Sequence, residues 1–372
     1  MEFVVAACLP AACWAQVNSG SDGSDGAFNP ATNTVIDMTD HPTGIYQFSS
    51  VYIPSGVAVS FLPNARNTPV VWLVQSNCLI NGTVDVSGKN AQGNQAGGGG
   101  VGGWRGGGGI VGGEAGQGPG GGSASSGNRA FAAGGTYQYG NAFLVPLLGG
   151  SGGGAFSQTV GGGGGGGAIL IAVSGQVVLN GAILAKGGNA TYYPDPSADS
   201  AWGGGGSGGA VRLVGQTIVG TGAISVGGGI AANGGGYGRV RFDTFENGFT
   251  GGITGNFTQG SQFVVIPAAG QVPQLRIASI GGVVVGASPG GIISVPDAVL
   301  SAQQSNPIPV VVSCSNLPLH SLVTVSVKPV NGSAVSVTCY NDSGTLASST
   351  ATASVSIPRG GGITYATAAT SN

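Results

Sequence analysis

Charged side chains are what this sequence has least of. Only 24 of its 372 residues are charged, 11 of them Lys or Arg and 13 Asp or Glu, and the net charge is −2. Globular proteins usually carry about a quarter of charged residues. Nucleic-acid binding needs clustered Lys and Arg against phosphates, so that class is excluded. With two histidines, five cysteines and no CxxC spacing, a zinc site is excluded as well.

Long apolar runs are also scarce. No segment has the 18 or more uninterrupted apolar residues that a transmembrane helix needs, so none is expected. The first 15 residues hold an apolar run, Phe3–Trp14, with small residues Cys13 and Ala15 ahead of Gln16. This pattern is typical of a secretory signal peptide, although the basic start is missing. We predict a signal peptide at 1–15 and a secreted protein at the cell surface or outside the cell. The alternative is a buried N-terminal strand.

Glycine is what the sequence has in excess. Its 77 glycines run in blocks rather than at every third position, which excludes collagen. So much glycine also disfavours helical bundles. Hydrophobic residues make up 41% and mean hydropathy is +0.28, whereas disordered chains are polar and highly charged. The composition therefore predicts an all-β protein with glycine-rich excursions.

Three segments share one pattern of apolar strand, polar step, apolar triplet, glycine turn and final short strand. They are VWLVQSNCLINGTVDVSG (71–88), AILIAVSGQVVLNGAILAKGG (168–188) and AVRLVGQTIVGTGAISVGG (210–228), and their turns align at Gly82, Gly181 and Gly222. Each unit is too small to bury a core alone, and no helical pattern links them. We expect a parallel β-solenoid (β-helix) over 16–243, with its end and a linker at 244–289.

The glycine blocks leave two interpretations open. Residues 93–167 hold the longest blocks, including seven consecutive glycines at 161–167. Such runs can be flexible linkers. Alternatively, extended glycine chains can pack side by side as in polyglycine II, because only glycine allows backbones to approach so closely. The run 161–167 leads directly into an apolar strand, which favours packing.

The chain changes character near Pro289. Glycine becomes rarer, and short alternating runs such as LVTVSVKP and AVSVTCY recur about every ten residues. This spacing is typical of a sandwich, so we expect a small Ig-like β-sandwich at 290–372. Cys314 and Cys339 lie in two of its runs and are predicted to form a disulfide, as suits an exported protein. Cys78 is expected to be a buried free thiol.

Several of these motifs resemble a known group of proteins. The run GSDGSDGAF, the strands around IPSGV, the NTPVVWLVQ and NGTVDVSG segments and the GGGGGGGAILIA and GGGGSGGAVRLV blocks are similar to glycine-rich secreted bacterial β-helix proteins of the haemagglutinin or adhesin kind. The resemblance covers about residues 20–245. It implies a structural role at a surface rather than a reaction. The blocks are also similar to the polyglycine-II regions of some phage adhesins and antifreeze proteins, without their regular spacing.

The segment after residue 191 has the side chains of a glycan-binding patch. Aromatic rings stack on sugar rings and carboxylates accept hydrogen bonds from hydroxyl groups. The candidate residues are Tyr192, Tyr193, Asp195, Asp199 and Trp202. The alternative is that these aromatic side chains only cap the side or end of the fold.

Three further groups of charged residues are candidates for a site. Asp22 and Asp25, in GSDGSDG, are a weak candidate for calcium, the one cofactor the sequence offers. A polysaccharide lyase or hydrolase could use the acids and arginines on or near the expected coils, although a solvated face of alternating charges explains them more simply. These residues are Asp85, Asp243, Glu246, Arg212, Arg239 and Arg241. Asp37, Asp40 and His41 are expected to cap a turn. No residue stands at a spacing that catalysis demands, so no catalytic residue is assigned.

The sequence as a whole therefore predicts a secreted, non-enzymatic structural or adhesive module. Its partners would be other copies of itself, packed laterally or in filaments, or surface glycans. The low net charge favours contact between copies because little repulsion opposes it. The alternative function is a glycan-binding or polysaccharide-degrading protein.

Overall fold

A computed structural model describes residues 17–125, 131–136, 140–193, 201–263, 273–287, 289, 295–329 and 334–369. The expected signal peptide at 1–15 lies outside these residues, as do Asp195 and Asp199. Strands dominate the described chain, and its helical segment is a single turn, η1 (Met38–Asp40). No helix there is long and apolar enough to cross a membrane.

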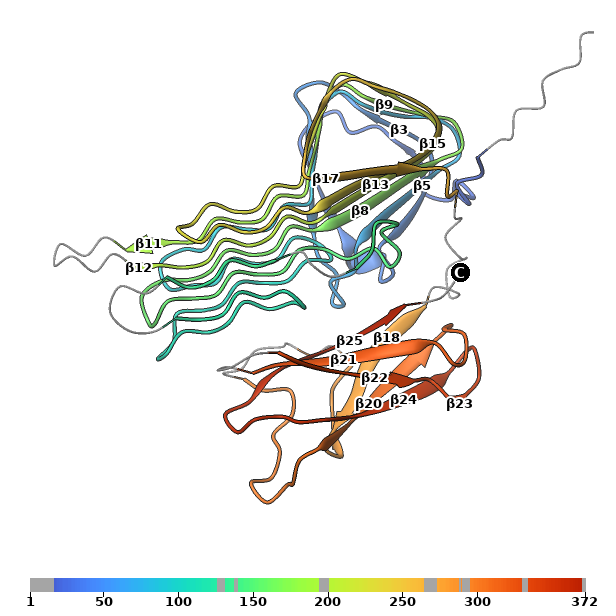
Figure 1. The fold of residues 1–372 in the computed structure, drawn as a ribbon. Coiled ribbons are helices and arrows are strands. Elements are labelled where there is room, and N and C mark those ends of the chain that lie inside the picture. Colours follow the sequence, from blue (N-terminus) through green and yellow to red (C-terminus); the bar gives the residue numbers. More distant parts are fainter. Residues whose placement is uncertain are drawn as a thin grey trace, which may run out of the picture.

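Two parallel sheets make up the first part of the chain (Figure 1). The larger contains β1 (Gly26–Phe28), β3 (Ile45–Ile53), β5 (Val70–Val74), β6 (Cys78–Ile80), β8 (Ala168–Val173), β9 (Gln176–Leu179), β13 (Ala210–Gly220), β15 (Arg239–Phe249) and β17 (Asn256–Gly260). The smaller contains β2 (Thr34–Asp37), β4 (Ala58–Leu62), β7 (Thr83–Asp85), β10 (Ala182–Leu184), β14 (Ala223–Ser225) and β16 (Gly252–Thr254). We call these two sheets the parallel unit.

The expectation of a β-solenoid is wrong. The larger sheet closes on itself through six parallel strands, in the order β13–β8–β5–β3–β6–β9 and back to β13, and the other sheets are flat. The closure arises because β3 and β13 are long and unbroken. Their neighbours are each split in two, β5 from β6 by residues 75–77 and β8 from β9 by 174–175, so one long strand pairs with both halves.

The core of the parallel unit consists of side chains that face inward in matching register. Trp72 lies opposite Ile171, Ile171 opposite Leu213, and Leu213 opposite Phe242, and all four are fully buried. Val84, Ile183 and Ile224 form a second such row in the smaller sheet. Alternate side chains in a strand point to opposite faces. Because the strands pair in matching register, the members of each of these two rows all point to the inner face. Each buried side chain of this size contributes about 1.5–3 kcal/mol.

The glycine blocks form a packed array of extended segments beside the sheets (Figure 1). Residues 161–167 are its centre. Their N–H groups donate hydrogen bonds to three neighbouring segments in turn, and their carbonyl groups accept from three others. Every third N–H group bonds the same neighbouring segment, as expected for a polyproline-II helix, which has three residues per turn. The donated bonds go to 86–93, 104–107 and 204–207. The bonds accepted by 161–166 come from 97–100, 150–153 and 188–191, and the Gly167 carbonyl accepts from the Ala210 N–H.

This packing explains why the segment is pure glycine. At each of residues 161–167, a Cβ atom would lie between 1.9 and 2.4 Å from a backbone oxygen of a neighbouring segment. Real Cβ atoms do not approach that closely. The glycine array, by which we mean 86–122, 149–167, 185–190, 203–209 and 226–238, is therefore ordered by its backbone and is not a loose linker.

The rest of the chain, residues 273–369, forms the C-terminal unit. One antiparallel sheet has the order β19 (Val283–Val284), β18 (Gln274–Ile280), β20 (Ile308–Ser315), β24 (Ser349–Val355) and β23 (Ser343–Gly344). The other has β22 (Val335–Tyr340), β21 (Leu322–Pro329) and β25 (Gly362–Ala369). Both sheets contribute to one apolar core. The unit begins with β18, within the 244–289 segment expected to be solenoid end and linker.

Candidate functional site

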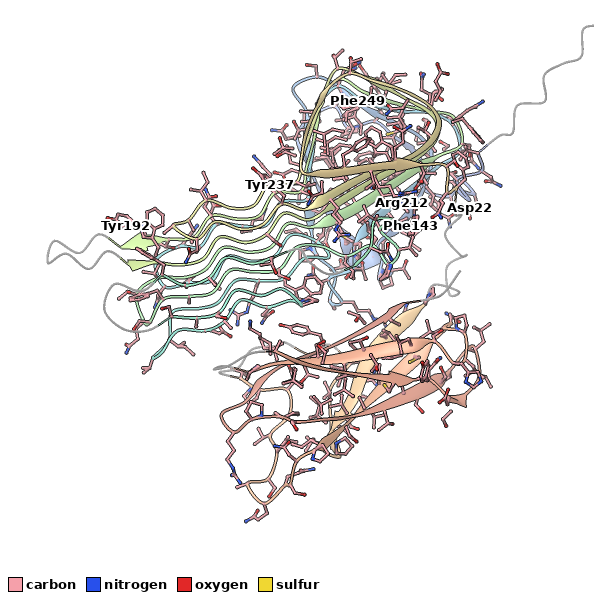
Figure 2. The ribbon with its side chains drawn as sticks, in the orientation of Figure 1. Asp22, Phe143, Tyr192, Arg212, Tyr237 and Phe249 are labelled. Carbon is pink, nitrogen blue, oxygen red and sulfur yellow. The ribbon has the colours of Figure 1, made fainter. Side chains whose placement is uncertain are left out.

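The aromatic residues of the expected glycan patch lie at the far end of the glycine array. Tyr192 (Figure 2) belongs to β11 (Tyr192–Tyr193) and Trp202 to β12 (Ala201–Trp202), and the two strands pair antiparallel. Their ring centroids are 4.4 Å apart at an interplanar angle of 34°, and Tyr192 is 42% exposed. The Tyr193 side chain lies outside the described residues, as Asp195 and Asp199 do. The structure thus brings two of the five candidates together.

The two candidate calcium ligands, Asp22 and Asp25, accept hydrogen bonds from different residues. Asp22 accepts a hydrogen bond from the Ser24 backbone N–H at 2.9 Å, and hydrogen bonds from Ser24 hold the pKa of Asp22 below its usual range. Asp25 instead accepts from the Gln47 N–H and lies 3.3 Å from Nε2 of His41. Within the described residues, no three His, Cys, Asp or Glu side chains are grouped to hold a metal. Calcium binding stays a prediction without geometric support here.

The residues around Asp25 form a polar cluster of their own. His41 Nδ1 lies 2.9 Å from Asp40, so the imidazole bridges two carboxylates, and its ring stacks on Tyr46 at 4.1 Å. Burial, with smaller contributions from nearby aspartates, raises the pKa of Tyr46. Asp37 caps η1 through the Thr39 N–H, as expected of a turn. This cluster ties the segment before β1 to the start of β3.

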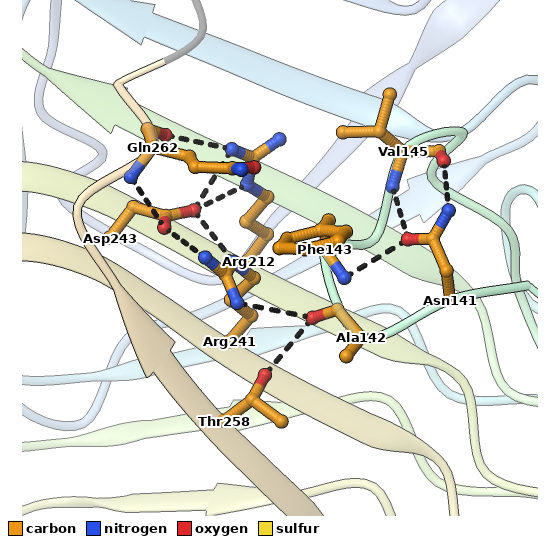
Figure 3. Close-up of polar contacts among 9 residues, drawn as sticks. All are labelled: Asn141, Ala142, Phe143, Val145, Arg212, Arg241, Asp243, Thr258 and Gln262. Atoms are coloured by element: carbon orange, nitrogen blue, oxygen red, sulfur yellow. Dashed lines mark hydrogen bonds and ion pairs between the residues drawn. The ribbon is translucent and has the colours of Figure 1, made fainter. Parts of the chain in front are cut away.

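A second cluster lies on the outer face of β13 and β15 (Figure 3). Arg212 and Arg241 are paired neighbours in these strands, and Asp243 lies between their guanidinium groups. Asp243 is fully buried and accepts from Nε of Arg212 and of Arg241, each at 3.0 Å, and from the Gln262 N–H at 3.0 Å. The interpretation of these residues as a solvated face is therefore wrong.

The cover over this cluster is a segment that we call the strap, residues 140–148. Its Ala142 carbonyl accepts from Nη1 of Arg241 at 3.3 Å and from Thr258 Oγ1 at 3.0 Å (Figure 3). The Phe143 ring lies 5.0 Å from the Arg241 guanidinium carbon, in the range of a cation–π contact. The Asn141 side chain fixes the strap internally by bonding both the N–H and the carbonyl of Val145.

The chemistry open to the cluster is structural. Burial lowers the pKa of Arg212, and the neighbouring Asp243 carboxylate opposes that change. Asp243 has no exposed surface and both of its oxygens already accept hydrogen bonds, so it is not placed to protonate or attack a substrate. The three side chains instead fasten the strap and residue 262 to the sheet. Sequence analysis missed this role because the strap lies about 100 residues before its arginine partner, Arg241.

The cysteines predicted to form a disulfide are free thiols in this structure. Cys314 Sγ lies 3.8 Å from the Val312 carbonyl oxygen, and Cys339 Sγ lies 3.6 Å from that of Val323. Both belong to the core of the C-terminal unit, on β20 and β22 in opposite sheets. Cys78 is a buried free thiol, and burial raises its pKa to about 12.

Comparison of the chain with protein-family models, with curated proteins and with solved structures finds no match.

Proposed function

We propose that this protein is a secreted structural or adhesive module that works by rigidity and surface contact rather than by catalysis. The observation that carries the proposal is the glycine array. Its central segment is hydrogen-bonded to six neighbouring segments, and its order needs no side chains. Such an array resists bending in more than one direction, and it carries aromatic residues at its surface, such as Tyr192 and Tyr237 (Figure 2).

The proposed partner is a second copy of the chain. In the larger sheet, β1 pairs with β3 and β17 pairs with β15 outside the closed ring, so each leaves an open edge. In the smaller sheet, β2 and β16 are the two edge strands. Open edges template pairing with another chain, and proteins usually protect them with Lys or Pro. None of the four segments, GAF, TVID, GIT and NFTQG, contains Lys, Arg or Pro. This supports association between copies through the strand edges.

A charge placed on an edge strand tests this proposal. Val35, 58% exposed on β2, is replaced by Lys, and Leu62, 53% exposed on the neighbouring inner strand β4, receives the same change as a matched control. We expect the wild type and Leu62→Lys to form assemblies by sedimentation and electron microscopy. Val35→Lys should shift the population toward monomer, because an edge lysine disfavours pairing. A monomeric wild type at high concentration, or equal assembly by both variants, would refute association through this edge.

The alternative function, glycan binding at the tip of the array, rests on the pair Tyr192 and Trp202. Two aromatic rings of which one is exposed offer an apolar face of the kind that stacks on a sugar ring. Titration of the protein with polysaccharides, followed by calorimetry, tests it. Trp202→Ala should abolish binding at this site, whereas Tyr237→Ala, which removes another exposed aromatic of the array, should not. If both variants bind as the wild type does, the tip is not the site.

A further inference from the structure

A cleft of about 780 Å³ lies between the glycine array and the C-terminal unit. Its size is in the range of small-molecule sites, which are about 300–1,000 Å³. The array contributes Trp104 and Gln117 to its lining. The C-terminal unit contributes β18, residues 296–306 and residues 357–365. None of the residues singled out in the sequence belongs to it.

The aromatic side of the cleft is built around Gly118. Its N–H donates a hydrogen bond of 2.8 Å to the hydroxyl oxygen of Tyr365. A Cβ on Gly118 would lie 2.9 Å from Cδ2 of Trp104, so the indole packs directly on this glycine. Gly118 has φ +96°, a conformation that favours glycine. One glycine thus holds a Trp from the array beside a Tyr from the C-terminal unit.

The opposite side of the cleft is held in place by hydrogen bonds of its own. Gln304 Nε2 donates to the Gly281 carbonyl at 3.0 Å, and Arg359 Nη2 donates to the Ala302 carbonyl at 3.1 Å. The Asn306 side chain bonds both the N–H and the carbonyl of Ile357. These contacts connect residues 302–306 to the turn that follows β18 and to residues 357–359 before β25, so this wall is formed in advance of any ligand.

The chemistry of the lining selects the class of ligand. Among the described residues that line the cleft, Asp297 is the one anion and Arg359 the one cation, so the cleft has no net charge. Amide side chains and apolar residues of β18 surround the two aromatic rings. A sugar has a matching combination, an apolar C–H face for an aromatic ring and hydroxyl groups for amide and carboxylate side chains. A ligand with several charges of one sign would meet only one group of opposite charge in this lining and would leave its other charges unpaired.

We propose that this cleft binds a short neutral oligosaccharide. The inference rests on the proposed adhesive function, for which it names the ligand class, but it uses residues separate from both the strand edges and the aromatic tip. Sugar rings would stack on Trp104, with Gln117 on the array side and Asp297 and Gln304 across the cleft as hydrogen-bonding partners.

The test is calorimetric titration of the full chain with neutral hexasaccharides of glucose, of xylose and of mannose, with hexagalacturonate as the acidic comparison. Trp104→Ala should weaken binding of the preferred neutral sugar by about tenfold or more, which equals 1.4 kcal/mol. Trp202→Ala, at the tip of the array, should leave the affinity within about twofold. Absence of binding by every neutral hexasaccharide, tighter binding of hexagalacturonate, or equal affinity of Trp104→Ala and wild type would overturn the inference.

A pair of surface variants keeps the test independent of folding. Val299 lines the cleft and is 71% exposed, while Val295 is 70% exposed and outside the lining. Val299→Lys places an additional charge in the neutral cleft and should reduce binding, whereas Val295→Lys should not. Equal affinities of these two variants would also overturn the inference. Val35→Lys separates the two proposals, because it should reduce assembly and leave sugar binding intact.

Discussion

At the scale of single residues, the array depends on glycines that cannot be replaced and tolerates change at others. Gly164 and Gly98 illustrate this difference, although they lie next to each other in the array. A Cβ on Gly164 would lie 2.0 Å from the Gly98 carbonyl oxygen, whereas a Cβ on Gly98 would meet nothing closer than 3.9 Å. The same substitution is therefore a clash at one and harmless at the other.

We expect Gly164→Ala to lower the free energy of unfolding by about 3 kcal/mol, because overpacking against backbone costs about 1–3 kcal/mol and the neighbouring segments are fixed. Gly98→Ala should be neutral or stabilise by up to about 1 kcal/mol, by restricting the unfolded chain. Denaturant unfolding of the parallel unit measures both. Equal stability of the two variants would contradict the packed array.

The buried thiol of Cys78 gives a prediction on pH. Its pKa of about 12 is above the ordinary cysteine value of 9.0, so folding favours the neutral thiol. The stability that this provides is complete below pH 9 and is lost as the pH rises toward 12. Alkylation of the native protein at pH 8 should therefore spare Cys78 while Cys339, which is half-buried, reacts. Rapid native labelling of Cys78 would contradict its burial.

At the scale of elements, the strap is held by charge. Asp243 is the anion between two buried guanidinium groups, and Arg241 in turn bonds the Ala142 carbonyl. The strap also covers apolar positions on the outer face of the sheet, where Leu144 packs with Ala168 and Ala210. Loss of the Asp243 carboxylate should therefore loosen the strap, which lies about 100 residues earlier in the chain.

We expect Asp243→Ala to cost about 3–5 kcal/mol, because it leaves two buried cations without their partner. Amide hydrogen exchange within 140–148 should become faster. Glu246→Ala is the control, since it removes the same charge from an exposed position of β15. Unchanged exchange in the strap of Asp243→Ala, or an equal effect of Glu246→Ala, would show that this cluster does not hold it.

At the scale of the whole molecule, the two units have separate cores and few polar links. The hydrogen bonds described between them join Arg66 to Gln274, Gly118 to Tyr365 and Lys328 to Ser123. Burial lowers the pKa of Lys328 at this interface. Interfaces of this kind allow relative motion of the units and weak thermodynamic coupling.

Calorimetry should therefore resolve two unfolding transitions. Gly164→Ala should lower the temperature of one, and Val325→Ala, in the core of the C-terminal unit, should lower the other. A fully buried valine truncated to alanine costs on the order of 2 kcal/mol, enough to shift a transition measurably. A single transition that both variants shift equally would show that the units unfold together.

The sequence by itself determined where several strands lie and which apolar residues they contain. Alternating apolar residues, with turns at Gly82, Gly181 and Gly222, predicted the segments that pair as β7, β10 and β14 in the observed register, because period-two patterning is a local property. It also separated the glycine-poor C-terminal strands from the rest. It placed Tyr192 and Trp202 in one candidate patch, with Tyr193, Asp195 and Asp199, by their chemistry alone.

Only the tertiary structure decided how these pieces close and what covers them. Whether β3 and β13 run unbroken past split neighbours depends on long-range pairing, so the closed sheet replaced the expected solenoid. Glycine blocks have the same local sequence whether loose or packed, and only contacts among six segments fix them. The cleft at Trp104 and Tyr365 joins residues more than 240 positions apart, a distance over which no local pattern in the sequence carries information.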